Sequence, residues 1–233
     1  MRFSSLLKKE LRECLPWMLL AAIVFIAVTS VLLRIETYNE NNDYRYSRFS
    51  PGTVISNSHY NLTNYPTMNE IGPWLFVLSV GLGLVLGIRQ FWIPNFTRTW
   101  PFLIHRSVSR ITILAAKLTA TSMAFVISIV PIWIGIYWYV TRPEVFTVPP
   151  PLRFFIEGWI FIILGFVTYL GTALSGLSTA KWYTTKIFGL AFAAVVMLTT
   201  FSQWSLVWIF TVIAVSTAIL LSQIFQTFLR REF

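Results

Sequence analysis

Six runs of mostly apolar residues, each long enough to cross a lipid bilayer, constrain the fold of this chain more than any other feature. A helix of about 20 apolar residues crosses a hydrocarbon core of roughly 30 Å. The runs cover residues 15–33, 72–88, 118–140, 154–177, 182–201 and 204–228. Hydrophobic residues make up 56% of the chain and charged residues 12%, a balance typical of membrane proteins. The sequence therefore predicts an all-α integral membrane protein, a single transmembrane domain over residues 1–233 with six transmembrane helices.

The fifth and sixth runs are separated by only two residues, Ser202 and Gln203. We interpret this pair of runs as a helical hairpin. The alternative is one long span followed by a re-entrant segment, which the bilayer tolerates only where protein surrounds it.

The distribution of Lys and Arg predicts the orientation in the membrane, because loops on the cytoplasmic side carry an excess of these residues. In the six-span arrangement, 13 of the 18 basic residues fall on the same side as the N-terminus. The C-terminus lies on that side too, so both termini are predicted to be cytoplasmic. The basic residues are scattered over the ends of the apolar runs and form no single patch, which argues against a nucleic-acid partner.

Two segments outside the apolar runs differ from the short loops: one is amphipathic and the other is polar. In residues 1–14, Lys8, Lys9 and Arg12 lie on one helical face and apolar side chains lie on the other. With Pro16 breaking the direction, we expect an in-plane amphipathic helix whose basic face meets anionic headgroups of the bilayer. The alternative is that this segment simply extends the first span. Residues 34–71 are rich in Asn, Tyr, Ser and Thr, and we expect them to form an external loop.

The sequence carries no pattern of a catalytic or metal site. It contains no H-E-x-x-H, no G-x-S-x-G and no G-x-x-x-x-G-K-[ST], and its single cysteine, Cys14, offers no metal cluster. The middles of the six runs lack ionisable residues, which an ion-coupled carrier would place there. We therefore expect neither an enzyme nor a stand-alone carrier, with no cofactor or metal bound to this chain.

The segment 89–117, between the second and third runs, carries five positive and no negative charges. Thr99 is suited to cap a short helix that starts with Pro101 in its first turn, and Ser109 is suited to cap the third span. One interpretation is a docking element for a cytoplasmic partner. The other is that the arginines only set the topology while Trp100 and Phe102 anchor the segment in the interface.

The residues of this segment resemble a known family. The matching positions are Thr99, Trp100, Phe102, Leu103, Val108, Ser109, Arg110, Ile113, Leu114, Ala116, Lys117 and Leu118. They are similar to the cytoplasmic segment of ABC-2 type exporter permeases, commonly GT-x-x-F-L-x-x-x-P-V-S-R-x-x-I-L-x-x-K-L. The N-terminal helix and the six-span plan are also similar to that family. The chain departs from the pattern at Arg98, which precedes the threonine where relatives have glycine, and at Ser107, where proline is common.

The resemblance implies a short cytoplasmic coupling helix that docks on a separate ATPase subunit. The residues it assigns to ATPase coupling are Thr99, Trp100, Phe102, Leu103, His105, Arg106 and Arg110. It implies two copies of that subunit, which would bind ATP and Mg²⁺, and a second permease copy or a homologous permease. The expected protein is a multi-pass exporter subunit of a prokaryotic cytoplasmic (inner) membrane, with a hydrophobic or amphipathic substrate such as a lipid, drug or peptide. The alternative is a non-transporting scaffold or assembly factor that binds a cytoplasmic partner through the same loop.

Small residues at four-residue spacing predict close helix contacts within the membrane. Gly83 and Gly87 form one such track, and Gly171, Ser175 and Thr179 form another. We expect both tracks to serve packing within the chain, and the alternative is a seam between two copies.

Overall fold

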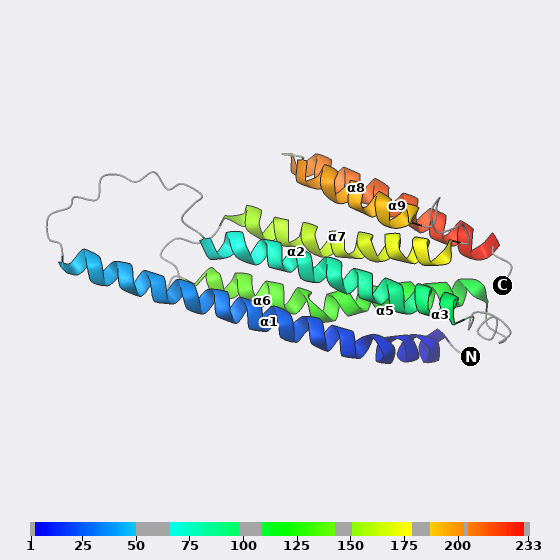
Figure 1. The fold of residues 1–233 in the computed structure, drawn as a ribbon, viewed down its shortest axis with the longest axis horizontal. Helices are drawn as coiled ribbons and strands as arrows, with labels where there is room; N and C mark the ends of the chain where they lie inside the picture. Colours follow the sequence, from blue (N-terminus) through cyan, green and yellow to red (C-terminus); the bar gives the residue numbers. More distant parts are fainter. Residues whose placement is uncertain are drawn as a thin grey trace.

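The computed structural model describes residues 3–49, 66–97, 109–142, 151–178, 187–202 and 205–230, and these segments form an elongated bundle of helices (Figure 1). The elements in chain order are α1 (Phe3–Phe49), α2 (Pro66–Gly87), the π-helical segment η2 (Ile88–Trp92), α3 (Ile93–Phe96), α5 (Arg110–Ser128), α6 (Val130–Val140), α7 (Leu152–Leu177), α8 (Phe188–Ser202) and α9 (Leu206–Arg230). The prediction of an all-α protein is confirmed for these residues.

Five of the described helical stretches are long and apolar enough to cross a membrane, in agreement with a membrane-embedded protein. They are Phe3–Arg34, Ile71–Phe96, Arg110–Val140, Leu152–Leu177 and Leu206–Leu229. The predicted fifth span corresponds to α8, an apolar helix of 15 residues. Its first predicted residues, 182–186, lie outside the described residues, so a sixth span stays a prediction. Helices α8 and α9 pack against each other, as expected for a hairpin.

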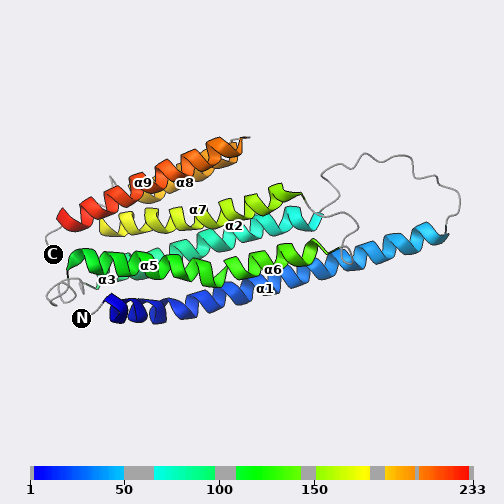
Figure 2. The same cartoon turned by 180° about the vertical axis from the view of Figure 1, so that it is seen from behind.

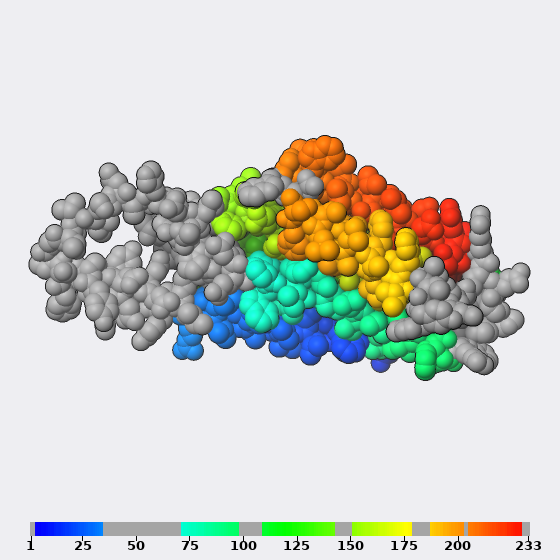
Figure 3. All heavy atoms as spheres, turned by 45° about the horizontal axis from the view of Figure 1, so that its top comes forward, coloured from blue at the N-terminus to red at the C-terminus, as the bar shows by residue number. Residues whose placement is uncertain are grey.

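Helix α7 lies at the centre of the bundle. It packs against α2 on one side and against α8 and α9 on another, while α1 lies on the far side of α2 and α5 (Figures 1 and 2). In the most apolar 18-residue stretch of α7, 83% is buried inside the bundle, compared with 11% in the corresponding stretch of α1. Figure 3 shows that side chains of the outer helices α1, α2, α8 and α9, together with those at the start of α7, form the surface of one side of the bundle. The apolar faces of these outer helices are therefore available to lipid or to a partner in the membrane.

Glycines allow the backbones of α2 and α7 to approach closely. A Cβ atom on Gly165 of α7 would lie 2.5 Å from the carbonyl oxygen of Ser79, and one on Gly87 of α2 would lie 2.6 Å from Cβ of Thr172. A Cβ atom on Gly83 would likewise collide with the carbonyl oxygen of Gly165. The prediction that Gly83 and Gly87 pack within the chain is confirmed.

The second track of small residues contacts α8. A Cβ atom on Gly171 would lie 2.5 Å from the carbonyl oxygen of Gly189, and the Ser175 hydroxyl accepts a hydrogen bond of 3.0 Å from the backbone N–H of Leu190. Intrachain packing is therefore confirmed for this track as well, apart from Thr179, which lies outside the described residues.

Helix α1 is longer than expected from the sequence. It is one continuous helix of 47 residues that includes Pro16, so the predicted separation of residues 1–14 from the first span is not confirmed. At 1.5 Å per residue α1 is about 70 Å long, more than twice the thickness of the hydrocarbon core. The expected external loop 34–71 is helical at both ends, because α1 reaches Phe49 and α2 starts at Pro66. Extending a formed helix avoids the nucleation step, which explains why the polar residues after the first span continue it.

The expected cytoplasmic segment 89–117 is also helical at both ends. Segments η2 and α3 prolong α2 as far as Phe96, and α5 begins at Arg110. The Ser109 hydroxyl accepts a hydrogen bond of 3.2 Å from the backbone N–H of Thr112, so the predicted N-cap of this helix is confirmed. The start of α1, the end of α3, the start of α5 and the end of α9 all lie at the same end of the bundle (Figures 1 and 2). We call this the terminal end.

Candidate functional site

Most residues predicted to couple to an ATPase lie outside the described residues. These are Thr99, Trp100, Phe102, Leu103, His105 and Arg106. Arg110 is described, in the first turn of α5, where its guanidinium donates a hydrogen bond of 3.4 Å to the backbone carbonyl of Leu229 near the end of α9. The start of α5 and the end of α9 are therefore in contact at the terminal end.

The three basic residues predicted to meet the membrane surface are exposed on α1. Lys8, Lys9 and Arg12 all lie on its outer side, and Lys9 forms an exposed ion pair with Glu13 at 3.8 Å. Their positions agree with the expected basic face, although this face belongs to the continuous helix α1.

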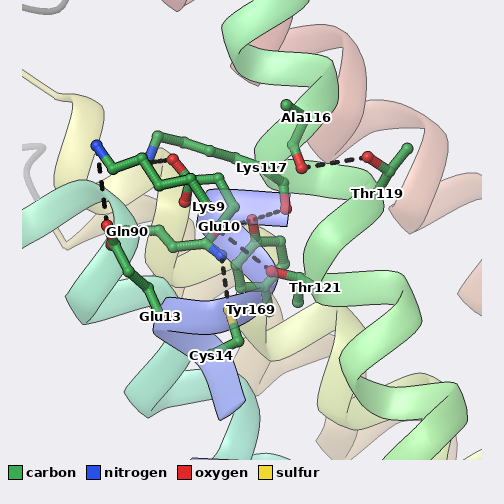
Figure 4. Close-up of polar contacts among 10 residues, drawn as sticks. All are labelled: Lys9, Glu10, Glu13, Cys14, Gln90, Ala116, Lys117, Thr119, Thr121 and Tyr169. Carbon is green, nitrogen blue, oxygen red and sulfur yellow. Dashed lines mark hydrogen bonds and ion pairs between the residues drawn. The ribbon is translucent and has the colours of Figure 1, made fainter. Parts of the chain in front are cut away.

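A buried ion pair connects the opposite face of α1 to α5. The Lys117 ammonium donates a hydrogen bond of 2.9 Å to Oε1 of Glu10, and the two side chains are only 5% and 10% exposed (Figure 4). Lys117 lies two turns after the start of α5. The sequence pattern placed it among the positive charges of the cytoplasmic loop, and this placement is corrected by its burial within the bundle.

Gln90 is the centre of a hydrogen-bond network next to this pair. Its amide nitrogen donates to the Cys14 sulfur at 3.3 Å, and its amide oxygen accepts from the hydroxyls of Tyr169 at 2.7 Å and Thr121 at 3.2 Å (Figure 4). We call Glu10, Cys14, Gln90, Lys117, Thr121 and Tyr169 the polar cluster. Its members come from α1, η2, α5 and α7, so the cluster connects four elements at one place.

The π-helical segment η2 directs Gln90 into the bundle. A π-helical turn holds more residues than an α-helical turn and so rotates the following side chains about the helix axis; such turns are frequent at functional sites. Gln90 and Phe91 are both buried as a result. Two further hydrogen bonds fix this region to α7: the Trp92 indole donates to the carbonyl of Thr172 at 3.0 Å, and the Asn95 amide donates to the carbonyl of Gly176 at 2.9 Å.

A cavity of about 520 Å³ lies at the terminal end beside the same segment. Its lining is mainly apolar and includes Ile88, Ile93 and Phe96, with Gly176 of α7 at its wall. Phe96 is 93% exposed. Next to the end of α3, the bundle therefore presents an apolar hollow, in contrast to the polar cluster within.

The electrostatics of the polar cluster are unusual for a membrane protein. Burying an ion pair carries a desolvation penalty that the attraction between the charges only roughly offsets. Oε2 of Glu10 is buried and has no hydrogen-bond partner among the residues that the structure describes. The Glu10–Lys117 pair therefore adds little to stability, and its role is better understood as fixing the position of α1 relative to α5.

One sequence feature, the position of Glu10, indicates this cluster, but none of the predicted sites includes it. Glu10 is four residues from both Leu6 and Cys14, which places an acidic residue on the apolar face of the N-terminal helix. Such a residue needs a basic partner inside the protein. No sequence pattern predicted the π-helical turn that brings Gln90 to the same place.

Within the described part of the chain, no three His, Cys, Asp or Glu side chains are grouped so that they could hold a metal ion. Comparison of the chain with protein-family models, curated proteins and solved structures finds no match. The class that fold and site define is an all-α membrane-embedded protein with a buried polar cluster at its terminal end.

Proposed function

We propose that this chain is the transmembrane permease subunit of an ABC exporter in a prokaryotic inner membrane. The observation that carries the proposal is the pattern from Thr99 to Leu118, which resembles the coupling segment of ABC-2 type permeases. ATP and Mg²⁺ bind to a separate ATPase subunit, present in two copies, and this chain contributes no catalytic residue. The permease works as a pair, with a second copy or a homologous permease.

The packing at the terminal end supports this proposal, because it connects the helices on both sides of the coupling segment to the rest of the bundle. When ATP closes the ATPase dimer, the subunits push on the segment between α3 and α5. The first half of α5 is connected to α1 by the ion pair of Glu10 and Lys117, and η2 is connected to α7 by the hydrogen bond between Gln90 and Tyr169. Since α7 packs against α2, α8 and α9, a displacement at this end moves most of the bundle together.

The outer surfaces support a hydrophobic or amphipathic substrate. Helices α1, α8 and α9 expose large apolar side chains, among them Ile23, Leu198 and Trp208. A lipid, drug or peptide that enters from the bilayer would meet such surfaces first. The substrate pathway lies at the interface between the two permeases. Lys8 and Arg12 of α1 interact with anionic lipid headgroups.

The test is purification of the tagged chain from its native membrane in mild detergent. We expect the wild type to bring with it a subunit that hydrolyses ATP. The triple variant Trp100→Ala, Phe102→Ala, Arg106→Ala should lose that subunit, because these residues form the docking element. The variant should still be present in the membrane at the wild-type amount.

A matched control places the same three changes at the opposite end of the bundle, as Trp138→Ala, Phe210→Ala, Arg142→Ala. These side chains are exposed, and we expect the control to retain the ATPase subunit. If the wild type instead recovers only a partner without ATPase activity, lost in the triple variant, the scaffold function replaces our proposal.

A further inference from the structure

The buried ion pair connects α1 to the helix that follows, along the chain, the segment that we propose to be touched by the ATPase. Lys117 is on the helix that follows residues 98–108, and Gln90 is on the helical extension that precedes them. Glu10 and Cys14, on α1, contact these two residues from the same helix face. One face of α1 thus bridges the two helices between which the coupling segment runs.

We propose that Glu10 and Lys117 are positioning residues for the coupling segment. Their ion pair fixes the position of the first half of α5 relative to α1, and the hydrogen bonds of Gln90 fix the position of η2 relative to α1, α5 and α7. The two helices that flank residues 98–108 are thereby held at a fixed spacing. The role in coupling rests on the proposed function, whereas the role in fixing the helices does not.

The energetics of the pair favour positioning over stabilisation. A buried pair contributes little net stability compared with apolar side chains of similar volume, yet removal of one partner leaves a charge without compensation. A hydrogen-bonded pair holds its two helices in a defined geometry that apolar contacts, which are non-directional, do not impose. Only 10% of the Glu10 side chain is exposed, so water does not replace Lys117 in the docked arrangement.

The hydrogen bonds of Gln90 add three further constraints. Its partners Cys14, Thr121 and Tyr169 belong to three different helices, and all three distances depend on the π-helical turn. A shift of α5 that breaks the ion pair also carries Thr121, one turn further along the same helix, away from Gln90. The ion pair and the amide network therefore report on the same displacement.

Cys14 provides a reporter for this displacement. It is the sole cysteine of the chain, it is fully buried, and it contacts Gln90. A thiol reacts with a maleimide only when it is accessible, so its rate of labelling measures how often α1 separates from η2 and α5. The measurement uses the full chain in native membrane vesicles with a membrane-permeant maleimide.

In the experiment, Glu10→Gln and Lys117→Met are compared with the charge swap Glu10→Lys, Lys117→Glu. Each single change leaves one buried group without its partner, and we expect labelling of Cys14 at least about fivefold faster than in the wild type. The swap restores opposite charges and should return the rate to within about twofold of the wild type. The control Lys9→Met removes the exposed pair with Glu13, one residue away, and should leave the rate unchanged.

Two outcomes would overturn the assignment. One is a wild-type labelling rate in both single variants, and the other is a swap variant that labels as fast as the single variants. If a single variant fails to accumulate in the membrane, the amount of protein is scored in its place. Recovery of that amount by the swap then supports the pairing, and no recovery refutes it.

A second readout separates positioning from general stability. The uncharged pair Glu10→Gln, Lys117→Met leaves no buried charge and should unfold at nearly the wild-type temperature. We expect it to bind the ATPase subunit but to lower ATP hydrolysis several-fold, because the helices are no longer held at a fixed spacing. Hydrolysis at the wild-type rate would refute the role in coupling. If the wild type recovers no ATPase at all, the proposed function fails while the labelling result still decides the role of the pair.

Discussion

The replacement of Gly165 by alanine tests the close packing of α2 on α7, on which the central position of α7 depends. The added Cβ atom would lie 2.5 Å from the backbone oxygen and 2.6 Å from the backbone carbon of Ser79, whereas ordinary contact begins at 3.4 Å. Both are backbone atoms, so no side chain can rotate away and the helices must separate by roughly 1 Å. Overpacking of this kind destabilises a protein by about 1–3 kcal/mol.

Gly81→Ala is the matched control, because its Cβ atom would meet nothing within 4 Å. Both changes gain the same intrinsic helix preference of alanine, about 1 kcal/mol, so the difference between them isolates the overpacking. The assay is thermal unfolding in detergent, in which 1 kcal/mol corresponds to about 2–4 °C for a chain of this length. Gly165→Ala should unfold at a lower temperature than Gly81→Ala. Equal unfolding temperatures would refute the tight α2–α7 contact.

Two single contacts and two exposed positions lead to three more predictions. Ser109→Ala removes the N-cap of α5 and should lower its stability by about 1 kcal/mol in the same assay, whereas Ser109→Asp should not. Tyr169→Phe removes the 2.7 Å hydrogen bond to Gln90 and should destabilise the chain by about 1 kcal/mol, and no loss would show that the bond contributes nothing net. Thr97 and Arg142 are exposed at opposite ends of the bundle. A membrane-impermeant maleimide should therefore label the variants Thr97→Cys and Arg142→Cys from opposite sides of the membrane. Labelling of both from one side would contradict the transmembrane arrangement.

The apolar helices, and the positions suited to capping and close packing, could be predicted from the sequence because they depend on local patterns, whereas the helices that these positions contact could not. Ser109 was expected to cap the third span, and it does. Gly83, Gly87 and Gly171 were expected to pack within the chain, and each faces the backbone or a side chain of a neighbouring helix. A serine just before a helix and glycines spaced four residues apart within a span each favour one local role, capping or close packing.

The polar cluster could not be assembled in the same way, because it depends on contacts between distant positions. Glu10 and Lys117 are separated by 107 residues, and Gln90 reaches Cys14, Thr121 and Tyr169 from a π-helical turn. The continuity of α1 through Pro16 agrees with the alternative prediction, that the N-terminal segment extends the first span, and not with the preferred one. Proline removes one backbone hydrogen bond, while Cys14 and Trp17 on either side of it pack with the core and hold the helix in place.

The central claim is that the chain works as the permease of an ATP-driven exporter. Native mass spectrometry of the complex purified from its own membrane tests the claim most directly. We predict an assembly of two permease subunits and two ATP-binding subunits that hydrolyses ATP in the presence of Mg²⁺. A particle that contains only this chain, in each of several mild detergents, would contradict the claim.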